Sequence, residues 1–494
     1  MSSQSPFGGL APRRLGAMHI VFFTVAASAP LTVLGGGVTT TFAVSGSLGA
    51  PLSFVVLAIV LAIFAVGYSA MSRYVANAGA FYAYLAQGLG RAFGVSASFV
   101  ALLAYNAIQI GLYGLFGYAV GGFINEKAGL TWHWSVYAFI AMGIIGLLGV
   151  LKVDLNATVL AVFLIAECII IAIFDVLALG SPAAGSLSLD GLNPSQLFNG
   201  TIGAVMALGI AAFAGFESGA IFSEEAKDPK RTIARATYIA VAFTGIFYAF
   251  SSYALLQAVG PTGDTGIAAT SAAAGPGALF GTLGALSNGF MADAAVVLFA
   301  TSVFAAMLSF HNGVARYFFA LGRERVLPGV LGRTGVRTGA PFVGSLLQTI
   351  IAAVVVTIAV VSGTDPLLEL FTWLSGVSAV GLVALLTGTS IAVIGFFLRR
   401  QTEENLWQRI IAPALAAILL ASVLFLIVTN FEYLGVSPES KLMWILPGFT
   451  LVAAVLGLIW GLALKQVRSD VYNGIGQSAT DRLEVLPEST YATL

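Results

Sequence analysis

The chain has 494 residues, of which 58% are hydrophobic and only 9% charged, and its mean hydropathy is +0.95. This composition excludes a soluble multidomain protein and places the chain in a lipid bilayer. The net charge of zero, without a protruding basic patch, removes nucleic acid as a partner.

Apolar runs follow one another almost from end to end, each near the length that a helix needs to cross roughly 30 Å of hydrocarbon. We expect twelve spans, at 19–44, 52–75, 96–122, 134–151, 156–180, 197–223, 236–259, 286–318, 342–362, 367–397, 409–429 and 443–465. The short alternating segments of a β-barrel are not found. The sequence therefore predicts an all-α integral membrane protein with about 12 transmembrane helices, numbered below as spans one to twelve.

Basic residues gather at alternate ends of these spans, as they do in cytoplasmic loops. They precede span one and border the even-numbered spans: Arg13, Arg14, Arg73, Arg91, Lys152, Lys227, Lys230, Arg231, Arg235, Arg323, Arg325, Arg333, Arg337, Arg399, Arg400, Lys465 and Arg468. Only Lys127 and Lys441 fall clearly on the other side. We expect a multi-pass protein of the plasma (inner) membrane with both termini cytoplasmic.

Polar stretches are too short for a separate soluble domain. We divide the chain into a cytoplasmic segment at 1–15, a transmembrane domain at 16–465 and a polar cytoplasmic tail at 466–494. The one cysteine, Cys168, lies within span five, so no disulfide framework exists. No metal or cofactor is expected.

Two spans differ from the rest because proline or glycine interrupts them. Span one contains "AASAPLTVLGGGV" (26–38), and span six contains "GIAAFAGFESGA" (209–220). Each is expected to open into two half-helices, and they begin two successive groups of five spans. Interrupted spans at matching positions are typical of an inverted-repeat transporter with its site at the midplane. The alternative is that the small residues only permit close helix packing.

Half-helices expose amides at a positive dipole end and carbonyls at a negative end, which suits a zwitterion. A substrate carboxylate is predicted on the amides around Ala27, Ser28, Ala29 and Leu31, and an ammonium group on the carbonyls around Phe213, Ala214 and Gly215. The hydroxyls of Ser28 and Thr32 are further partners, although such groups often bond their own backbone.

Two carboxyl groups lie deep in the expected spans, Glu217 in span six and Glu167 in span five. Intramembrane carboxylates are costly, so each is a candidate proton carrier or cation partner, with a structural strut as the alternative. Phe213, Phe216 and Phe310 are candidate gates or cavity walls, with core packing as the alternative. Gln109 of span three is a candidate cavity residue or an interhelical contact.

Three motifs resemble those of the amino acid-polyamine-organocation (APC) superfamily of permeases. They are "SRYVANAGAFYAYLAQGLGR" (72–91), "FAGFESGAIFSEEAKDPKRT" (213–232) and "ARYFFALGRERVLP" (315–328), and the resemblance covers roughly residues 15–465. It implies a 5+5 inverted repeat of the leucine-transporter type, with repeats at about 16–180 and 197–397 and two extra helices at 409–465. It also implies a site between spans one, three, six, eight and ten, and alternating access.

The chain departs from that pattern at two places. "SAPLT" replaces the usual Gly-Ser/Thr-Gly of span one, and Glu167 stands near the position of a lysine that proton-coupled relatives often carry in span five. Proton coupling is therefore a hypothesis that depends on Glu167.

We expect a secondary transporter that moves an amino acid by proton-coupled symport or exchange. A permease for a polyamine or another small organic amine is the alternative. A channel would need a continuous polar lining, and a membrane-embedded enzyme is disfavoured because its motifs are not found. The sequence leaves the oligomeric state open.

Overall fold

The computed structural model describes residues 21–476 except 22–23, 26–27, 76–80, 152–156, 218–228, 262, 336–337, 401 and 438. The described residues form helices and turns with no strand, which confirms the predicted all-α class. Of the candidate site residues, Ala27 lies outside the described residues, as do 1–15 and most of the tail.

Ten of the twelve expected spans are long apolar helices in the described part of the chain. They are α4 (Ala50–Ser72), α6 (Arg91–Ala128), α7 (Trp134–Leu151), α8 (Ala157–Gly180), α11 (Pro229–Val259), α14 (Gly289–Arg323), α15 (Phe342–Val361), η5 with α16 (Pro366–Phe371 and Thr372–Arg399), η6 with α17 (Trp407–Ile411 and Ala412–Thr429) and α18 (Leu442–Val467).

Spans one and six, the two expected to be interrupted, do not form single long helices. Span one divides into α2 (Pro30–Thr32), the π-helical η1 (Val33–Val38) and α3 (Thr39–Ser45), preceded by a break at Ala29. Span six contains α10 (Ile202–Ala212), which ends in a turn from Phe213. Glycine lets span one pass close to its neighbours: a β-carbon on Gly36 would lie 2.7 Å from Leu115 Cδ2.

Pairs of spans that are in contact have counterparts in the other group of five spans: if each span number of a pair is shifted by five, the resulting pair is also in contact. Span three (α6) packs on span four (α7), span nine (α15) and span ten (α16). Its counterpart, span eight (α14), packs on span nine (α15), span four (α7) and span five (α8). Likewise span one contacts span five (α2 with α8), as span six contacts span ten (α10 with α16). Span one also contacts span seven (η1 with α11), as span six contacts span two (α10 with α4). A 5+5 repeat requires this exchange of partners, although the repeat boundaries at 16–180 and 197–397 stay predictions.

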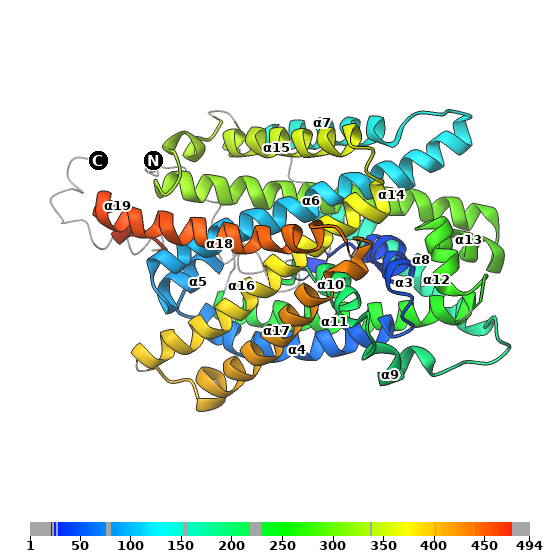
Figure 1. Cartoon of the computed structure of the whole chain (residues 1–494), viewed down its shortest axis with the longest axis horizontal. Coiled ribbons are helices and arrows are strands. Elements are labelled where there is room, and N and C mark those ends of the chain that lie inside the picture. The colour runs from blue at the N-terminus through cyan, green and yellow to red at the C-terminus, as the bar shows by residue number, and fades with distance from the viewer. Residues whose placement is uncertain are drawn as a thin grey trace.

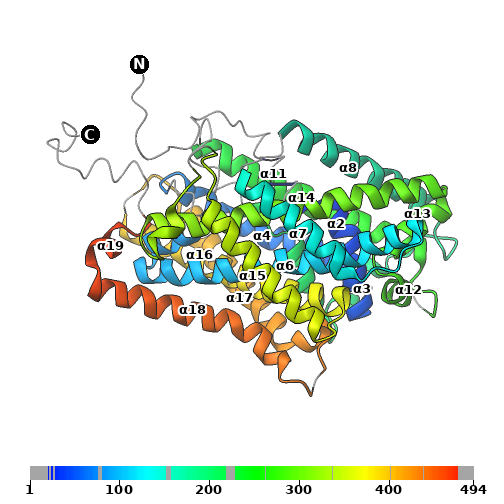
Figure 2. The same cartoon turned by 90° about the horizontal axis from the view of Figure 1, so that it is seen from above.

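The long helices run along the longest axis of the molecule (Figure 1). The short helices α5 (Phe81–Gly88) and α19 (Ser469–Gly474) lie at one end, and α12 (Ile267–Ala274) and α13 (Gly277–Leu286) lie at the other. Figure 2 shows α8 and α18 on opposite sides.

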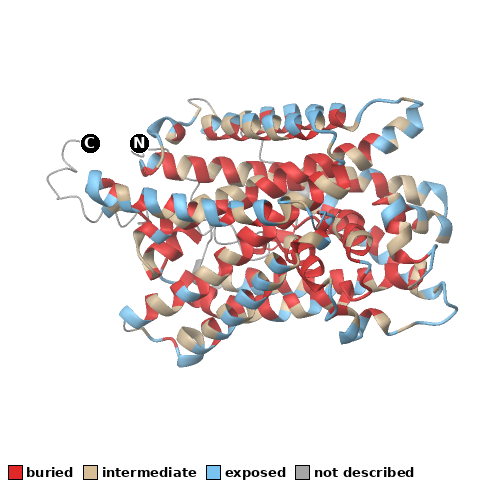
Figure 3. Ribbon diagram, viewed as in Figure 1, coloured by how far each residue is buried: buried red, intermediate tan, exposed pale blue. Residues whose placement is uncertain are grey.

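Buried residues concentrate around α6, α10 and α14 in the middle of the molecule, while outer helices such as α18 expose much of their surface (Figure 3). Most exposed side chains of α18 are themselves apolar, among them Leu451, Ile459 and Trp460. An apolar outer surface of this kind suits contact with lipid. The two interrupted spans therefore lie inside a lipid-facing ring.

Candidate functional site

The break in span one is set by Ala29 and Pro30. A residue that precedes proline is disfavoured in the right-handed helical region, because the proline ring crowds its backbone. Ala29 adopts φ 48° and ψ 77°, in the left-handed region, and Pro30 then opens α2 where its missing N–H costs nothing. The first amides of α2 are thus freed from the preceding helical segment.

The carboxyl group of Glu167 occupies the start of α2. The backbone N–H of Leu31 donates to Glu167 Oε2 at 3.3 Å, and Ser302 Oγ of α14 donates to the same oxygen at 2.7 Å. Only 4% of Glu167 is exposed. A carboxylate at a helix N-terminus is favoured by the free amides and by the helix dipole. Glu167 of α8 therefore joins span one to span eight.

Thr32 extends this connection. Its hydroxyl donates to Ser302 Oγ at 2.9 Å, and its backbone N–H lies 3.3 Å from the same oxygen. Ser302 is therefore the common partner of Thr32 and Glu167. The predicted substrate contacts Leu31 and Thr32 are engaged by the protein's own side chains in this conformation.

The break in span six surrounds a second buried carboxyl group. Gly215 has φ 103°, a conformation that favours glycine, and its N–H donates to Glu217 Oε2 at 3.1 Å. Tyr105 OH of α6 donates to Glu217 Oε1 at 2.5 Å, and Tyr68 OH of α4 donates to the Glu217 carbonyl at 3.2 Å. Glu217 is 1% exposed, so these donors rather than water satisfy its carboxyl oxygens.

Tyr248 of α11 touches both breaks. Its hydroxyl lies 2.7 Å from Ser28 Oγ and donates to the Ser28 carbonyl at 3.2 Å. Its ring packs edge-on to Phe213, with centroids 6.3 Å apart, and to Phe54 at 5.5 Å. The two interrupted spans are therefore held together by one side chain of span seven.

The other predicted aromatic residues sit in packed clusters. Phe216 meets Phe64 with centroids 6.1 Å apart, and Phe310 meets Tyr105 at 6.1 Å. Both Phe216 and Phe310 are buried, and Ala214 is 3% exposed. Phe310 therefore shares Tyr105 with the carboxyl group of Glu217.

Gln109 is buried away from these contacts. Its amide donates to Tyr113 OH at 2.9 Å, and its oxygen accepts a hydrogen bond from Gln348 of α15. None of the hydrogen bonds among the described residues links Gln109 to an interrupted span. The observed contacts match its role as an interhelical contact, and a place in the cavity stays a prediction.

The two carboxyl groups belong to different levels of the molecule. Ser302 of α14 binds Glu167, and Phe310 of the same helix packs on Tyr105, which binds Glu217. The two α14 residues are eight positions apart, which corresponds to about 12 Å of helical rise. The predicted residues thus form one group around Glu167 and another around Glu217, with Tyr248 between the breaks.

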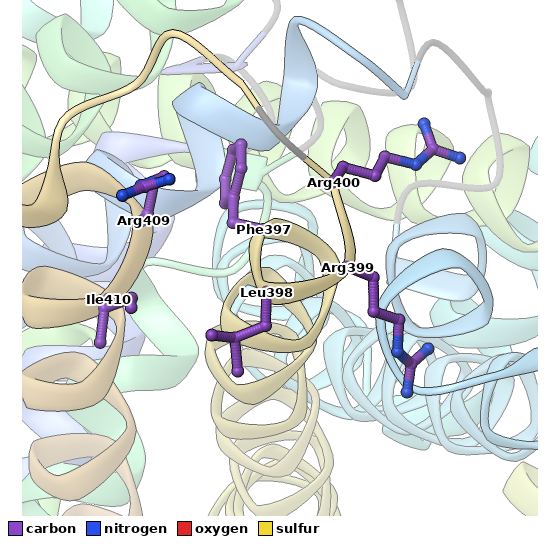
Figure 4. Close-up of a pocket in the computed structure, with 6 residues that line it drawn as sticks. All are labelled: Phe397, Leu398, Arg399, Arg400, Arg409 and Ile410. Atoms are coloured by element: carbon purple, nitrogen blue, oxygen red, sulfur yellow. The ribbon is translucent and has the colours of Figure 1, made fainter.

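A pocket of about 410 Å³ lies elsewhere, at the end of α16 (Figure 4). It is lined by Phe397, Leu398, Arg399, Arg400, Arg409 and Ile410. Figure 4 shows Arg399 and Arg400 extending away from Arg409. No lining residue comes from an interrupted span, so this pocket is separate from the candidate site at the two breaks. Among the residues that the structure describes, no group of three His, Cys, Asp or Glu side chains is placed to hold a metal ion.

Sequence reasoning missed two hydroxyl groups that organise the breaks, those of Tyr248 and Tyr105. Tyr105 begins the stretch "YNAIQIGLYG" of span three, in which Gln109 was the predicted site residue. Asn106 bonds its own helix, through Leu102 O at 2.6 Å. Neither tyrosine carries a local sequence signal, because its role depends on contacts between distant spans.

Long apolar helices around two interrupted spans, each with a buried carboxyl group at its break, define a multi-pass membrane transporter. The family model for amino acid permeases matches residues 19–456, and the chain belongs to that family. Its function is therefore amino acid transport, and its family consists of transporters rather than enzymes. No match was found among curated proteins.

Proposed function

We propose that the protein is a secondary active amino acid transporter that works by alternating access and couples transport to protons through Glu167. The observation that carries the proposal is the position of its carboxyl group, which binds span one at Leu31 and span eight at Ser302. Protonation of Glu167 would weaken its hold on the α2 amides, since these favour an anion. Proton binding would then change how span one is held against spans five and eight.

The substrate site is proposed at the breaks of spans one and six. The carboxylate of the amino acid is directed to the α2 amides, and its ammonium group to carbonyls near Phe213, Ala214 and Gly215. Burial supports this placement, because Ser28, Ala29 and Phe213 all lie inside the molecule. The contact of Tyr248 with both breaks supports it as well. The proposed orientation puts both termini in the cytoplasm, with the basic residues that border the even-numbered spans.

The test is uptake of labelled amino acids into liposomes that contain the purified protein, with and without an inward proton gradient. We expect the gradient to accelerate uptake in the wild type, and Glu167→Gln to abolish the acceleration while counterflow between the two sides persists. Glutamine keeps an oxygen for the Leu31 N–H, so the change removes the charge and leaves the size.

Glu126→Gln is the matched control, because Glu126 is exposed near the end of α6. It should leave gradient-driven uptake unchanged. Uptake by the wild type that ignores the gradient, or a Glu167→Gln variant that still responds to it, contradicts proton coupling through this residue.

An amine substrate is the second candidate, and one observation favours it. Both hydrogen bonds to Glu167 reach Oε2, and no described residue donates to Oε1. That oxygen is available to an ammonium group. A panel of the twenty amino acids and common polyamines, tested by thermal stabilisation of the detergent-purified protein, separates the two: a ligand that binds only the folded protein raises its melting temperature.

A further inference from the structure

Beyond span twelve, the segment 468–476 packs against α5 and the start of α6, at the same end of the molecule. Arg91 Nη1 at the start of α6 donates to Asn473 Oδ1 at 2.7 Å, and its guanidinium lies 5.7 Å from the centre of the Tyr472 ring. Gln87 Nε2 of α5 donates to the Gly476 carbonyl at 3.3 Å. These contacts bind the segment to α5 and α6.

Glu324, just beyond α14, connects the segment to span eight. Its Oε2 accepts hydrogen bonds from Tyr82 OH of α5 and from the Gly476 N–H, the latter at 3.4 Å. Glu324 is 7% exposed. One buried carboxyl group therefore holds α5, the end of α14 and the segment 468–476 together.

A small apolar cluster lies beneath these polar contacts. Its buried members are Tyr82, Ala86, Val95, Leu321, Val326, Leu464, Val471 and Ile475. Gly476 approaches α5 so closely that a β-carbon would lie 2.8 Å from Ala86 Cβ, and its φ of 72° favours glycine. Burial of Val471 and Ile475 removes apolar surface from water, so the hydrophobic effect stabilises the docked segment.

The opposite face of α5 leads to the break in span six. Tyr82 and Tyr84 are two positions apart, so they project in directions about 200° apart around the helix. Tyr84 packs edge-on to Tyr68, with centroids 5.1 Å apart, and Tyr68 OH donates to the Glu217 carbonyl. Helix α5 thus contacts the docked segment on one side and, through Tyr68, the Glu217 break on the other.

We propose that residues 468–476 form an autoinhibitory clamp, which holds α5 against the end of α14 and must release before this end of the transporter opens. The clamp joins elements from both groups of five spans to the chain beyond span twelve. Relative movement of the two groups at this end separates α5 from α14, and that separation disrupts the shared contacts of Glu324. Release also frees α5 to move with Tyr68 and the Glu217 break.

The first experiment locks the clamp with a disulfide between Ala86→Cys and Gly476→Cys. A disulfide needs about 3.5–4.5 Å between β-carbons, so a shift of about 1 Å accommodates the bond. We expect oxidation to stop uptake by the double variant and a reductant to restore it, while either single variant is insensitive to oxidation. Uptake by the oxidised double variant at the rate of its reduced form overturns the proposal.

The second experiment releases the clamp and measures amide hydrogen exchange of α5 in the complete, purified protein. Asn473→Ala removes the partner of Arg91, and Ile475→Asp places a charge in the apolar cluster. Loss of a hydrogen bond to a charged group changes the ratio of released to docked segment by about tenfold. We therefore expect faster exchange at residues 81–88 in both variants and a higher initial uptake rate.

Asp470→Asn is the matched control, since Asp470 is exposed on α19 and should alter neither readout. Unchanged exchange at α5 in both release variants overturns the clamp. The exchange experiment needs no transport substrate, so it decides the clamp even where the proposed coupling at Glu167 fails. If the double cysteine variant does not fold, the release variants still provide that decision.

Discussion

Ala29 has the backbone geometry on which the division of span one depends. A left-handed conformation costs a residue with a β-carbon roughly 1–2 kcal/mol, and Ala29 is buried with φ 48°. Pro30 explains why the preceding residue leaves the helix.

We expect Ala29→Val to lower the melting temperature and to slow transport, because a β-branched side chain fits this conformation poorly and is surrounded by packed neighbours. Ala29→Gly removes the steric strain and should leave the melting temperature unchanged or higher. Thermal unfolding of the purified variants checks both changes. Equal stability of the glycine and valine variants would show that the left-handed conformation is not maintained in the membrane.

Some residues of the candidate site were predictable and others were not. Glu167 and Glu217 stand out in any reading of the sequence, because a carboxyl group inside an apolar run demands a partner. Their partners do not stand out. Ser302 binds Glu167, and Tyr105, one of 15 tyrosines, binds Glu217, in each case only through contacts between distant spans. The engagement of Leu31 by Glu167 depends likewise on how α8 packs against α2.

At the scale of elements, the apolar runs predicted the long helices closely, because membrane thickness sets a narrow range of lengths. The region 260–285, between the expected spans seven and eight, contains α12 and nearly all of α13. Its alanines favour a helix and its glycines disfavour one, and α12 packs on α3 of the interrupted span one. Tertiary contact, which is not visible in the local sequence, accounts for these short helices.

Close helix packing supplies a prediction for α6. A β-carbon on Gly114 would overlap the Pro366 carbonyl oxygen at the start of η5, whereas one on Gly122 of the same helix would meet nothing within 4 Å. Gly114→Ala should therefore cost about 1–3 kcal/mol through overpacking.

Gly122→Ala is the control and should be neutral or slightly stabilising, because alanine favours a helix over glycine. Melting temperatures in detergent check the pair. A Gly114→Ala variant as stable as Gly122→Ala would mean that span three and span ten are not in this contact.

At the scale of the whole molecule, the exchange of contacts between spans n and n+5 gives the transporter two related halves. The sequence pointed to this arrangement through the two breaks and through the resemblance of three motifs to the APC superfamily, since the halves need not share residues to share a fold. The match to the amino acid permease family over residues 19–456 covers both halves and spans eleven and most of twelve.

The bond between Leu31 and Glu167 also bears on the empty carrier. A buried amide without a hydrogen-bond partner is costly. A carrier whose site amides lose their partner when the substrate leaves would therefore be slow to change back to its starting conformation without a new substrate. At the proposed substrate site, Glu167 accepts the Leu31 N–H that we assign to the substrate carboxylate. We therefore expect the unloaded protein to complete its cycle alone and to give net accumulation in liposomes that contain no internal amino acid. Uptake that strictly requires preloaded amino acid on the far side would contradict this expectation.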